Sequence, residues 1–261
     1  MRGMFLDIND EVINLDDKNI IKSNIKIFYL LEILVDHGRL SLSELSRLTG
    51  YSKSSTQRIV NTLKFMKYID QDKKTNEYYP SVKLYELGTR VINNLSIKNI
   101  SKPYLLELCN ISNETVNLGM LDKDSVIYID KIVSKSPLRI ELELGLRFPI
   151  YCTALGKSIA AFIDEEITFQ DKYIKYTKNT ISSDEELKKQ LMIVRKQGYA
   201  IEHEEYVMGL ICISVPILNL NGNAIASISI SIPAFRYDDN QIDYYVGLLK
   251  DTADKIQQSL F

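Results

Sequence analysis

Apolar residues recur at three- and four-residue intervals along the first hundred positions, which is the spacing of a single helix face. The pattern predicts an amphipathic helix over residues 23–35, two short helices between residues 41 and 66, and a further helix over residues 82–98. Residues 1–22 show no clear period and are expected to form a loosely ordered arm or part of a sheet edge. The first part of the chain is therefore predicted to be mainly helical.

The two short helices carry start and stop signals. Ser41 and Glu44 have the Ser-x-x-Glu spacing of a capping box, and Gly50 suits the end of that helix. Ser52 is placed to cap the second helix. The apolar positions of the second helix are expected to pack on the first: Thr56, Ile59, Val60, Leu63 and Met66. This arrangement is a helix-turn-helix.

Two short strand-like runs follow, on either side of residues 71–76. This polar, turn-rich loop contains Lys73 and Lys74, and the pattern predicts a β-hairpin with both lysines at its tip. Residues 1–81 are therefore expected to be the arm and a winged helix-turn-helix domain.

Residues 82–100 are expected to be a linker helix. Its narrow apolar stripe, which has to be covered by other apolar groups, consists of Leu84, Leu87, Val91 and Leu95. The covering surface is either the same domain or a second copy of the chain. Narrow stripes suit helix–helix seams, so the second copy is favoured.

From residue 101 the pattern changes to alternating strands and helices, and Ser101 and Pro103 suit the start of a helix. The Asn-Gly pair at 221–222 is a strong hairpin signal. The predicted strands cover residues 115–121, 125–132, 138–142, 211–218 and 224–232, and the predicted helices cover residues 154–163, 184–197 and 238–260. Residues 101–261 are thus expected to form an α/β domain, which makes the chain α+β overall.

Composition adds limits to this picture. The chain has 261 residues, 45% hydrophobic and 25% charged, which is enough for two ordinary cores. No run approaches the ~20 apolar residues that span a bilayer, and no signal-peptide pattern opens the chain, so no membrane partner is expected. Three cysteines without a CxxC spacing predict neither a disulfide framework nor a zinc ribbon. A reducing cytoplasm fits best.

Charge is distributed unevenly along the chain. Residues 38–90 contain ten Lys or Arg against five Asp or Glu, although the whole chain has a net charge of -2. Cations on the second short helix and the hairpin suit DNA phosphates, while Gln, Ser, Asn and Arg suit base edges. The candidate DNA contacts are Lys53, Ser54, Ser55, Gln57, Arg58, Asn61, Lys64, Lys73 and Lys74. A merely solvated helix face, or a protein-binding adaptor, is the alternative.

Several stretches resemble the IclR family of transcriptional regulators, in the same order along nearly the whole chain. They are LSELSRLTGYSKSSTQRIVNTL in the first domain and YCTALGKSIAAF, GYAIEHEEYVMGLICISVPIL and AIASISISIP in the second. The resemblance implies a GAF-like effector-binding domain and homodimers or homotetramers that bind double-stranded operator DNA. It also implies a repressor or activator that is controlled by a small metabolite, often a carboxylate.

The resemblance also implies effector contacts. The backbone amides of Ala154 and Leu155 would offer N–H groups to an anion at a helix start, although the same residues also suit an ordinary helix. Glu202 and Cys212 match an acidic and a cysteine position of the family's pocket, whereas Ile211 stands where an arginine is usual. Ser229 and Ser231 alternate along one strand, so both hydroxyls point to one face and suit a carboxylate. Without the resemblance, they would suit the solvent face of an edge strand.

Two other kinds of site are weaker alternatives. Cys152, Cys212, Glu202 and His203 have the ligand types for a soft divalent metal, but spacing across separate strands does not establish such a site. No glycine-rich phosphate loop, GxSxG elbow or HExxH motif supports an enzyme. We therefore expect no catalytic residues, no metal and no cofactor, and an organic acid as the effector.

Overall fold

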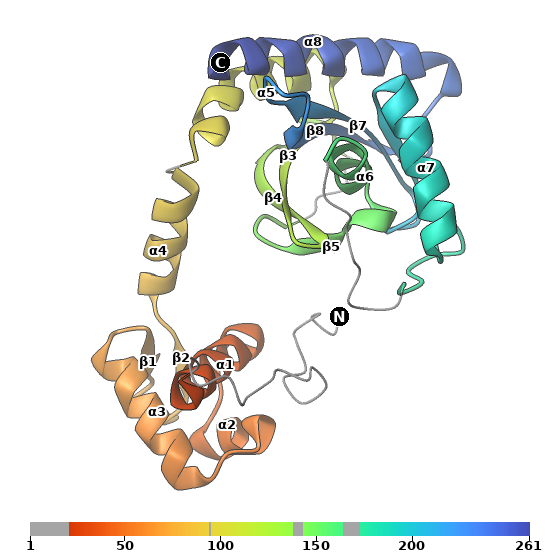
Figure 1. Ribbon diagram of the computed structural model, residues 1–261. Helices are drawn as coiled ribbons and strands as arrows, with labels where there is room; N and C mark the ends of the chain where they lie inside the picture. Colours follow the sequence, from red (N-terminus) through yellow and green to blue (C-terminus); the bar gives the residue numbers. More distant parts are fainter. Residues whose placement is uncertain (1–20, 94, 138–142, 164–172) are drawn as a thin grey trace. The chain divides into compact units, whose positions relative to one another are not determined.

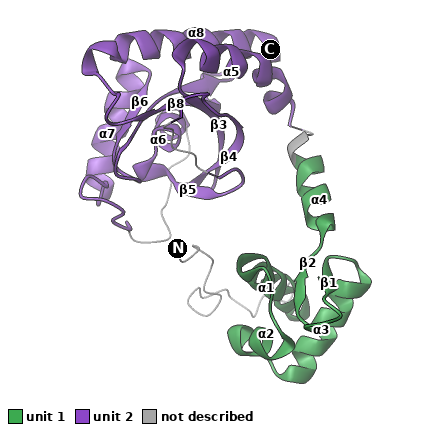
Figure 2. Ribbon diagram, turned by 180° about the vertical axis from the view of Figure 1, so that it is seen from behind, with its two compact units in different colours: residues 1–91 green, residues 92–261 purple. Residues whose placement is uncertain are grey.

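The chain divides into two compact units, residues 1–91 and residues 92–261, each with its own hydrophobic core (Figure 2). The computed structural model describes residues 21–93, 95–137, 143–163 and 173–261. The predicted arm therefore lies almost wholly outside the described residues, and so does the strand predicted at residues 138–142.

Unit 1 is a bundle of three helices with a two-stranded wing (Figure 1). Its elements are α1 (Lys22–His37), α2 (Leu42–Thr49), α3 (Lys53–Phe65), β1 (Ile69–Gln71), β2 (Tyr78–Pro80) and α4 (Val82–Asn93). Strands β1 and β2 pair antiparallel, and Leu40 adds a single bridge to Tyr78. The shared core includes Leu30, Leu34, Leu45, Ile59, Val60, Leu63 and Ile69. The predicted winged helix-turn-helix is confirmed.

The predicted caps explain where α2 and α3 begin and end. The Ser41 hydroxyl accepts the Glu44 N–H at 3.3 Å, and the Glu44 carboxylate accepts the Ser41 N–H at 2.8 Å. Gly50 ends α2 with a φ of 71°, which favours glycine. The Ser52 hydroxyl accepts the Ser55 N–H at 3.3 Å at the start of α3.

The single helix predicted over residues 82–98 is wrong. Helix α4 ends at Asn93, and α5 (Ser96–Ser112) begins after Leu95. Leu95 and Ile97 pack in the core of unit 2, so this end of the predicted stripe is used inside the second unit. Pro103 consequently lies inside α5 instead of near its start, and the expected boundary between residues 100 and 101 falls within that helix.

Unit 2 is built on a six-stranded antiparallel sheet in the order β5-β4-β3-β8-β7-β6. The strands are β3 (Thr115–Asp122), β4 (Ser125–Ile132), β5 (Arg147–Pro149), β6 (Ala200–His203), β7 (Leu210–Leu218) and β8 (Ala224–Pro233). Among the described elements, the helical ones besides α5 are η1 (Ile150–Cys152), α6 (Ala154–Ala160), α7 (Asp184–Gln197), η2 (Asp239–Gln241) and α8 (Ile242–Leu260). The expected α+β architecture is confirmed, while the short strands β5 and β6 were not predicted.

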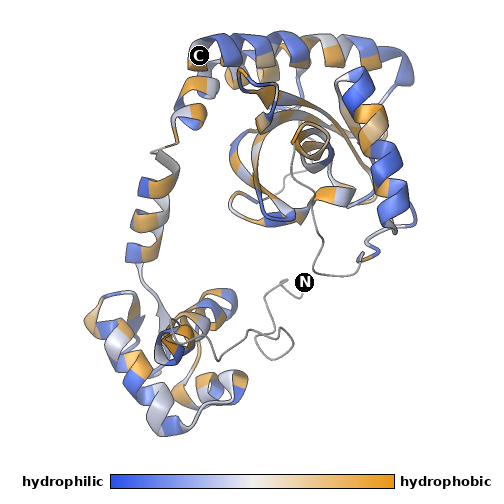
Figure 3. Cartoon of the chain, viewed as in Figure 1, coloured by the Kyte–Doolittle hydropathy of each residue, from blue (hydrophilic) through white to orange (hydrophobic). Residues whose placement is uncertain are grey.

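Side chains alternate between the two faces of this sheet. Ile228, Ile230 and Ile232 of β8 belong to the main core, together with buried residues of α5 and α8. Ser227, Ser229 and Ser231 point to the opposite face, where the curled sheet surrounds α6 (Figure 1). Helix α6 is short and mostly apolar (Figure 3), and all seven of its residues are buried. One face is thus an apolar core, whereas the other carries buried polar groups.

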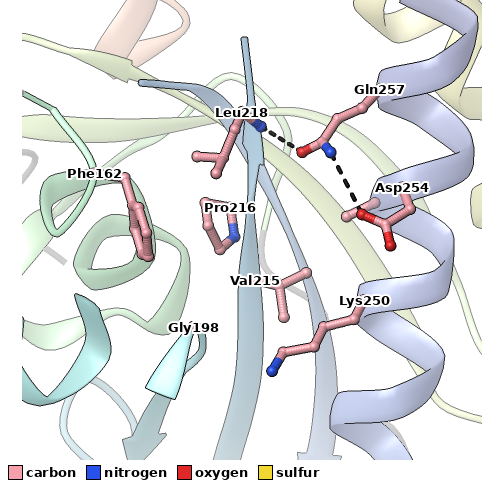
Figure 4. A pocket seen from close by; sticks show the side chains of 9 residues that line it. Phe162, Gly198, Val215, Pro216, Leu218, Lys250, Asp254 and Gln257 are labelled. Atoms are coloured by element: carbon pink, nitrogen blue, oxygen red, sulfur yellow. Dashed lines mark hydrogen bonds between the residues drawn. The ribbon is translucent and has the colours of Figure 1, made fainter. Parts of the chain in front are cut away.

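The open edge of the sheet is protected by side chains. Strand β6 pairs with β7 only from Ile211 to Ser214, so the end of β7 has no neighbouring strand on that side. Figure 4 shows Gln257 of α8 at this edge, where its Oε1 accepts the Leu218 N–H at 2.7 Å. Pro216 has no N–H group to offer there. A small hollow of about 180 Å³ lies beside these residues. We attribute it to the way α8 covers the unpaired end of β7.

No helix in the described part of the chain is both long and apolar enough to cross a membrane.

Candidate functional sites

The polar face of α3 carries the predicted contacts of the helix-turn-helix. Lys53, Ser54, Arg58, Asn61 and Lys64 are exposed, whereas Ser55 and Gln57 are partly buried. The Gln57 side-chain amide donates to Asn61 Oδ1 at 2.9 Å, and the Lys64 ammonium donates to Gln71 Oε1 of the wing at 2.7 Å. These hydrogen bonds order four polar side chains, three on α3 and one on the wing.

The two lysines of the wing lie on a turn that is held by hydrogen bonds to Asp72. Asp72 Oδ1 accepts the N–H groups of Lys74 at 2.7 Å and Thr75 at 3.2 Å, and these bonds lower the pKa of Asp72. The Lys73 and Lys74 side chains remain exposed at the tip. Sequence reasoning missed Arg39, which pairs with Asp72 at 3.1 Å and lies over the Tyr79 ring at 4.6 Å. A cation two positions before the Ser41 cap was the available signal.

A row of polar side chains crosses the α6 face of the sheet in unit 2. Asn117 of β3 donates from Nδ2 to the hydroxyl oxygens of Ser229 at 3.3 Å and Ser231 at 3.0 Å. Cys212 Sγ lies 3.3 Å from the Ser231 hydroxyl, and Glu202 pairs with Cys212 in the β6–β7 ladder. The structure therefore brings together four of the predicted effector contacts and adds Asn117.

The two serines are buried, 1% and 6% exposed, on a strand that lies between β3 and β7. The alternative that they line the solvent face of an edge strand is wrong. Because the Asn117 amide donates to both oxygens, the Ser229 hydroxyl hydrogen remains for another acceptor. No recognised motif marks Asn117 in the sequence, so its role depends on the register of β3 against β8.

Helix α6 begins beside this row. The Thr153 hydroxyl caps it by accepting the Gly156 N–H at 3.2 Å. A Cβ atom on Gly156 would lie 2.6 Å from the backbone of η1, so only glycine permits this approach. The Ser227 hydroxyl donates to the Leu155 carbonyl at 3.1 Å and ties the helix to β8. The backbone of Ala154 and Leu155 is thereby held on the serine side of the sheet.

Two glutamates and a lysine are buried next to the row. Glu202 Oε1 accepts the N–H groups of Glu205 at 2.7 Å and Tyr206 at 3.2 Å. Glu205 Oε1 accepts the Lys157 ammonium at 2.7 Å and the His203 N–H at 3.2 Å. Burial raises the pKa of Glu202 to about 7, and the backbone donors offset that effect only in part. Lys157 and Glu205 each lie within one of the quoted motifs, but nothing in the sequence indicates that they pair.

Tyr128 of β4 and Cys152 of η1 complete this group, at 3% and 0% exposed. Burial raises the pKa of both, and the charge of Glu202 adds to the effect. Burial likewise raises the pKa of the Cys212 thiol, so both thiols stay protonated at neutral pH. We call the following side chains the buried polar cluster: Asn117, Tyr128, Cys152, Lys157, Glu202, Glu205, Cys212, Ser229 and Ser231.

The structure does not bring the four metal-type residues together. His203 follows Glu202 in β6 and points to the opposite face, where its ring meets Tyr237 edge-on at 5.5 Å. No three His, Cys, Asp or Glu residues of the described ranges form a metal-binding group. Ile211 alternates with Cys212 in the same way and is 2% exposed, so its side chain is buried on the face opposite Cys212.

The titration of Glu202 leads to a stability prediction. The folded protein holds this proton up to about pH 7, whereas the reference carboxyl has a pKa of 4.5. Because the folded state binds the proton more tightly, the free energy of unfolding falls as pH rises through this window, by up to about 3 kcal/mol, and levels off above it. Glu202→Gln imitates the protonated carboxyl and is expected to remove that part of the pH dependence. Urea unfolding at about pH 5 and about pH 8 checks this, and an unchanged dependence in the variant contradicts it.

Comparison with known proteins agrees with this architecture. Residues 89–258 match the C-terminal domain model of the bacterial transcriptional regulator IclR, and residues 25–73 match the IclR helix-turn-helix model. The chain is 36% identical over 244 residues to the HTH-type transcriptional regulator KdgR of Escherichia coli (strain K12), covering 92% of this chain and 93% of KdgR.

Two further relatives extend the comparison. The HTH-type transcriptional repressor AllR of the same strain is 28% identical over 227 residues, covering 85% of this chain and 84% of AllR. The crystal structure of Thermotoga maritima IclR is 32% identical, with a TM-score of 0.74, and the match covers 91% of this chain and 98% of that one. The chain therefore belongs to the IclR family of bacterial transcriptional regulators.

Proposed function

We propose that this protein is a repressor that binds double-stranded operator DNA through α3 and the wing and is controlled by an organic acid bound in unit 2. The observation that carries the first part is the exposed face of α3 beside a wing that also presents lysines, within a segment rich in positive charge. The relative AllR is named a transcriptional repressor, which supports repression over activation. Three free cysteines suit a cytoplasmic location.

The α3 and wing contacts are expected to contribute differently. Gln57→Ala and Arg58→Ala each remove a base-edge contact, so we expect a loss of roughly 1–3 kcal/mol and a relaxed sequence preference. Lys73→Ala and Lys74→Ala each remove a phosphate contact, so binding weakens on all duplexes and the salt slope falls by about one unit. Fluorescence anisotropy with the protein's own upstream DNA, across a salt series, measures both quantities.

Lys189→Ala serves as the control for this series, because it removes an exposed cation from α7 in the other unit. It is expected to leave both specificity and the salt slope unchanged. Wild-type binding without any salt dependence would refute the assignment and favour the protein-adaptor alternative.

The effector is proposed to be a hydroxy or keto acid. Ser229 and Ser231, with the amides of Ala154 and Leu155, supply donors for a carboxylate, each contributing about 1.5–3 kcal/mol in a shielded site. Glu202 repels an anion unless it accepts from a hydroxyl group or is protonated. An acid with an added hydroxyl or keto group therefore fits better than a fatty acid. The proposal includes binding only, with no catalytic step, metal or cofactor.

The protein is further proposed to be a homodimer or homotetramer whose DNA-binding units pair through α4. Leu87 and Val91 are 37% and 64% exposed in unit 1. They are four residues apart in α4 and therefore lie on one face of this helix. Leu84, by contrast, packs against the core of its own unit. A paired arrangement matches two DNA half-sites.

A further inference from the structure

The end of α3 has a backbone conformation that lysine rarely adopts. The Tyr68 N–H donates to the Leu63 carbonyl at 2.9 Å. The Lys67 N–H donates to the Lys64 carbonyl at the same distance, and the two bonds together form the Schellman pattern of a helix end. This pattern puts one residue in the left-handed region, where glycine is favoured, and that residue is Lys67, with a φ of 61°. The strain of a lysine there has to be offset by contacts from elsewhere.

The contacts come from Ser81 and Lys83, where the wing passes into α4. The Ser81 hydroxyl donates to the Lys67 carbonyl at 2.5 Å, and the Ser81 N–H donates to the Tyr68 carbonyl at 2.9 Å. The Lys83 ammonium donates to the Met66 carbonyl at 2.7 Å and lies 4.3 Å from the centre of the Tyr68 ring. We call these five residues the α3–α4 clip, because they join the end of one helix to the start of the other.

Few other contacts hold α4 to the rest of unit 1. Among the α4 side chains that the structure describes, Leu84 is the only apolar one that packs against the core of this unit. Most of the positions that follow are exposed, including Leu87 and Val91. Beyond its first turn, the helix extends away from α1, α2 and α3 (Figure 2). The clip and Leu84 therefore set the direction of α4 relative to α3.

This direction matters because the two helices have different tasks in the proposed function. Helix α3 carries the base contacts, whereas α4 carries Leu87 and Val91, through which two copies are proposed to pair. In such a pair, the angle between α3 and α4 determines how far apart the two copies of α3 lie. Each base pair between two half-sites changes their separation by about 3.4 Å and their relative rotation by about 36°. A fixed angle therefore selects one spacing of half-sites.

We propose that Ser81 and Lys83 are positioning residues that fix the preferred spacing of DNA half-sites by holding the start of α4 to the end of α3. This inference rests on the proposed pairing through α4 and deepens it, because it names the contacts that set the geometry of the pair. Neither residue has to touch DNA. The alternative is a clip that only stabilises the end of α3, as cations near the last carbonyls of a helix generally do.

Duplexes with altered half-site spacing test the proposal. Duplexes are selected from a random pool with the wild-type full chain, and their half-sites are mapped by hydroxyl-radical footprinting. The selected duplex is then remade with one base pair inserted or removed between the half-sites. The wild type is expected to bind these duplexes about tenfold less tightly, because the change removes part of the avidity of a paired site.

Two variants release the clip. Lys83→Met keeps an apolar stem beside Tyr68 but removes the donor to the Met66 carbonyl. It is expected to reduce the spacing penalty to about threefold or less, because a loosely held α4 lets the two copies of α3 adapt to either duplex. Ser81→Ala removes a single hydroxyl and is expected to act in the same direction. It provides the test if Lys83→Met does not fold.

Two further variants serve as controls. Lys83→Arg is expected to restore the wild-type penalty, since a guanidinium also donates to a carbonyl. Arg90→Met removes an exposed cation of the same helix outside the clip and is expected to keep the penalty. Circular dichroism and thermal unfolding show whether each variant is folded.

The outcomes separate this inference from the function on which it rests. An unchanged spacing penalty in the folded clip variants overturns the proposal and leaves the clip as a helix cap. An equal loss of affinity on all duplexes with a lower salt slope also overturns it, because Lys83 would then contact phosphate. A wild type that selects single half-sites, or no duplex, overturns the proposed pairing or DNA binding itself, and this inference with it.

Discussion

Replacing Ser229 and Ser231 with alanine is expected to abolish the effector response while leaving effector-free DNA binding near the wild-type level. The two hydroxyls are buried on one face of β8, and Asn117 donates to both, which leaves the Ser229 hydrogen available for a carboxylate. Two lost hydrogen bonds to a charged group correspond to at least about a hundredfold loss of effector affinity. DNA binding depends on residues of the other unit, so the substitutions remove only the coupling between effector binding and DNA binding.

The measurement is operator affinity with and without a hydroxy or keto acid that changes the operator affinity of the wild-type protein. Ser214→Ala is a matched control, because this serine is equally buried on the same face but its hydroxyl pairs with Ser158 at 2.6 Å. The control is expected to respond to the acid as the wild type does. A full ligand-induced change in the double variant would place the effector elsewhere in the protein.

Changing Leu87 and Val91 together to glutamate is expected to produce monomers with intact secondary structure. Both side chains are exposed on α4, so the changes create no cavity in unit 1. Two carboxylates in an apolar seam, however, oppose its formation, because each would lose its hydration there. Loss of the paired arrangement is expected to lower operator affinity by about 10²–10⁴-fold, since the second half-site contact is no longer intramolecular.

Sedimentation velocity reports the assembly, and circular dichroism reports the helices. Arg90→Glu is a useful control, because it adds the same two units of negative charge at an exposed polar position of the same helix. It is expected to leave the assembly intact. Unchanged sedimentation of the Leu87 and Val91 double variant would show that α4 is not the seam.

Local signals were sufficient for the helix-turn-helix and the wing. The Ser41 capping box, the Gly50 end and the Ser52 cap depend on residues within a few positions of one another, and each forms the predicted hydrogen bonds or backbone angle. Lys73 and Lys74 are found at the wing tip for the same reason, because a polar turn between two short strands is a local pattern. A helix face and a hairpin can therefore be predicted from the sequence alone.

The end of the linker helix shows where local periodicity stops being enough. The spacing of Leu84, Leu87, Val91 and Leu95 is continuous in the sequence, yet the helix ends at Asn93 and Leu95 packs in the other unit. An apolar stripe reports only that a face has to be covered. Which surface covers each residue depends on tertiary packing, which overrides the helical period.

For the pocket, the sequence by itself determined the serine face of β8, because alternation along a strand is a property of the backbone. Only the tertiary structure decided which groups meet those serines. The pairing of β3 with β8 brings in Asn117, and the packing of α6 onto the sheet joins Lys157 to Glu205 across 48 positions. The alternation of side chains along β6 also sends His203 to the face opposite Glu202, so the four metal-type residues do not meet. Contacts between distant segments depend on register and layer packing, which no local spacing encodes.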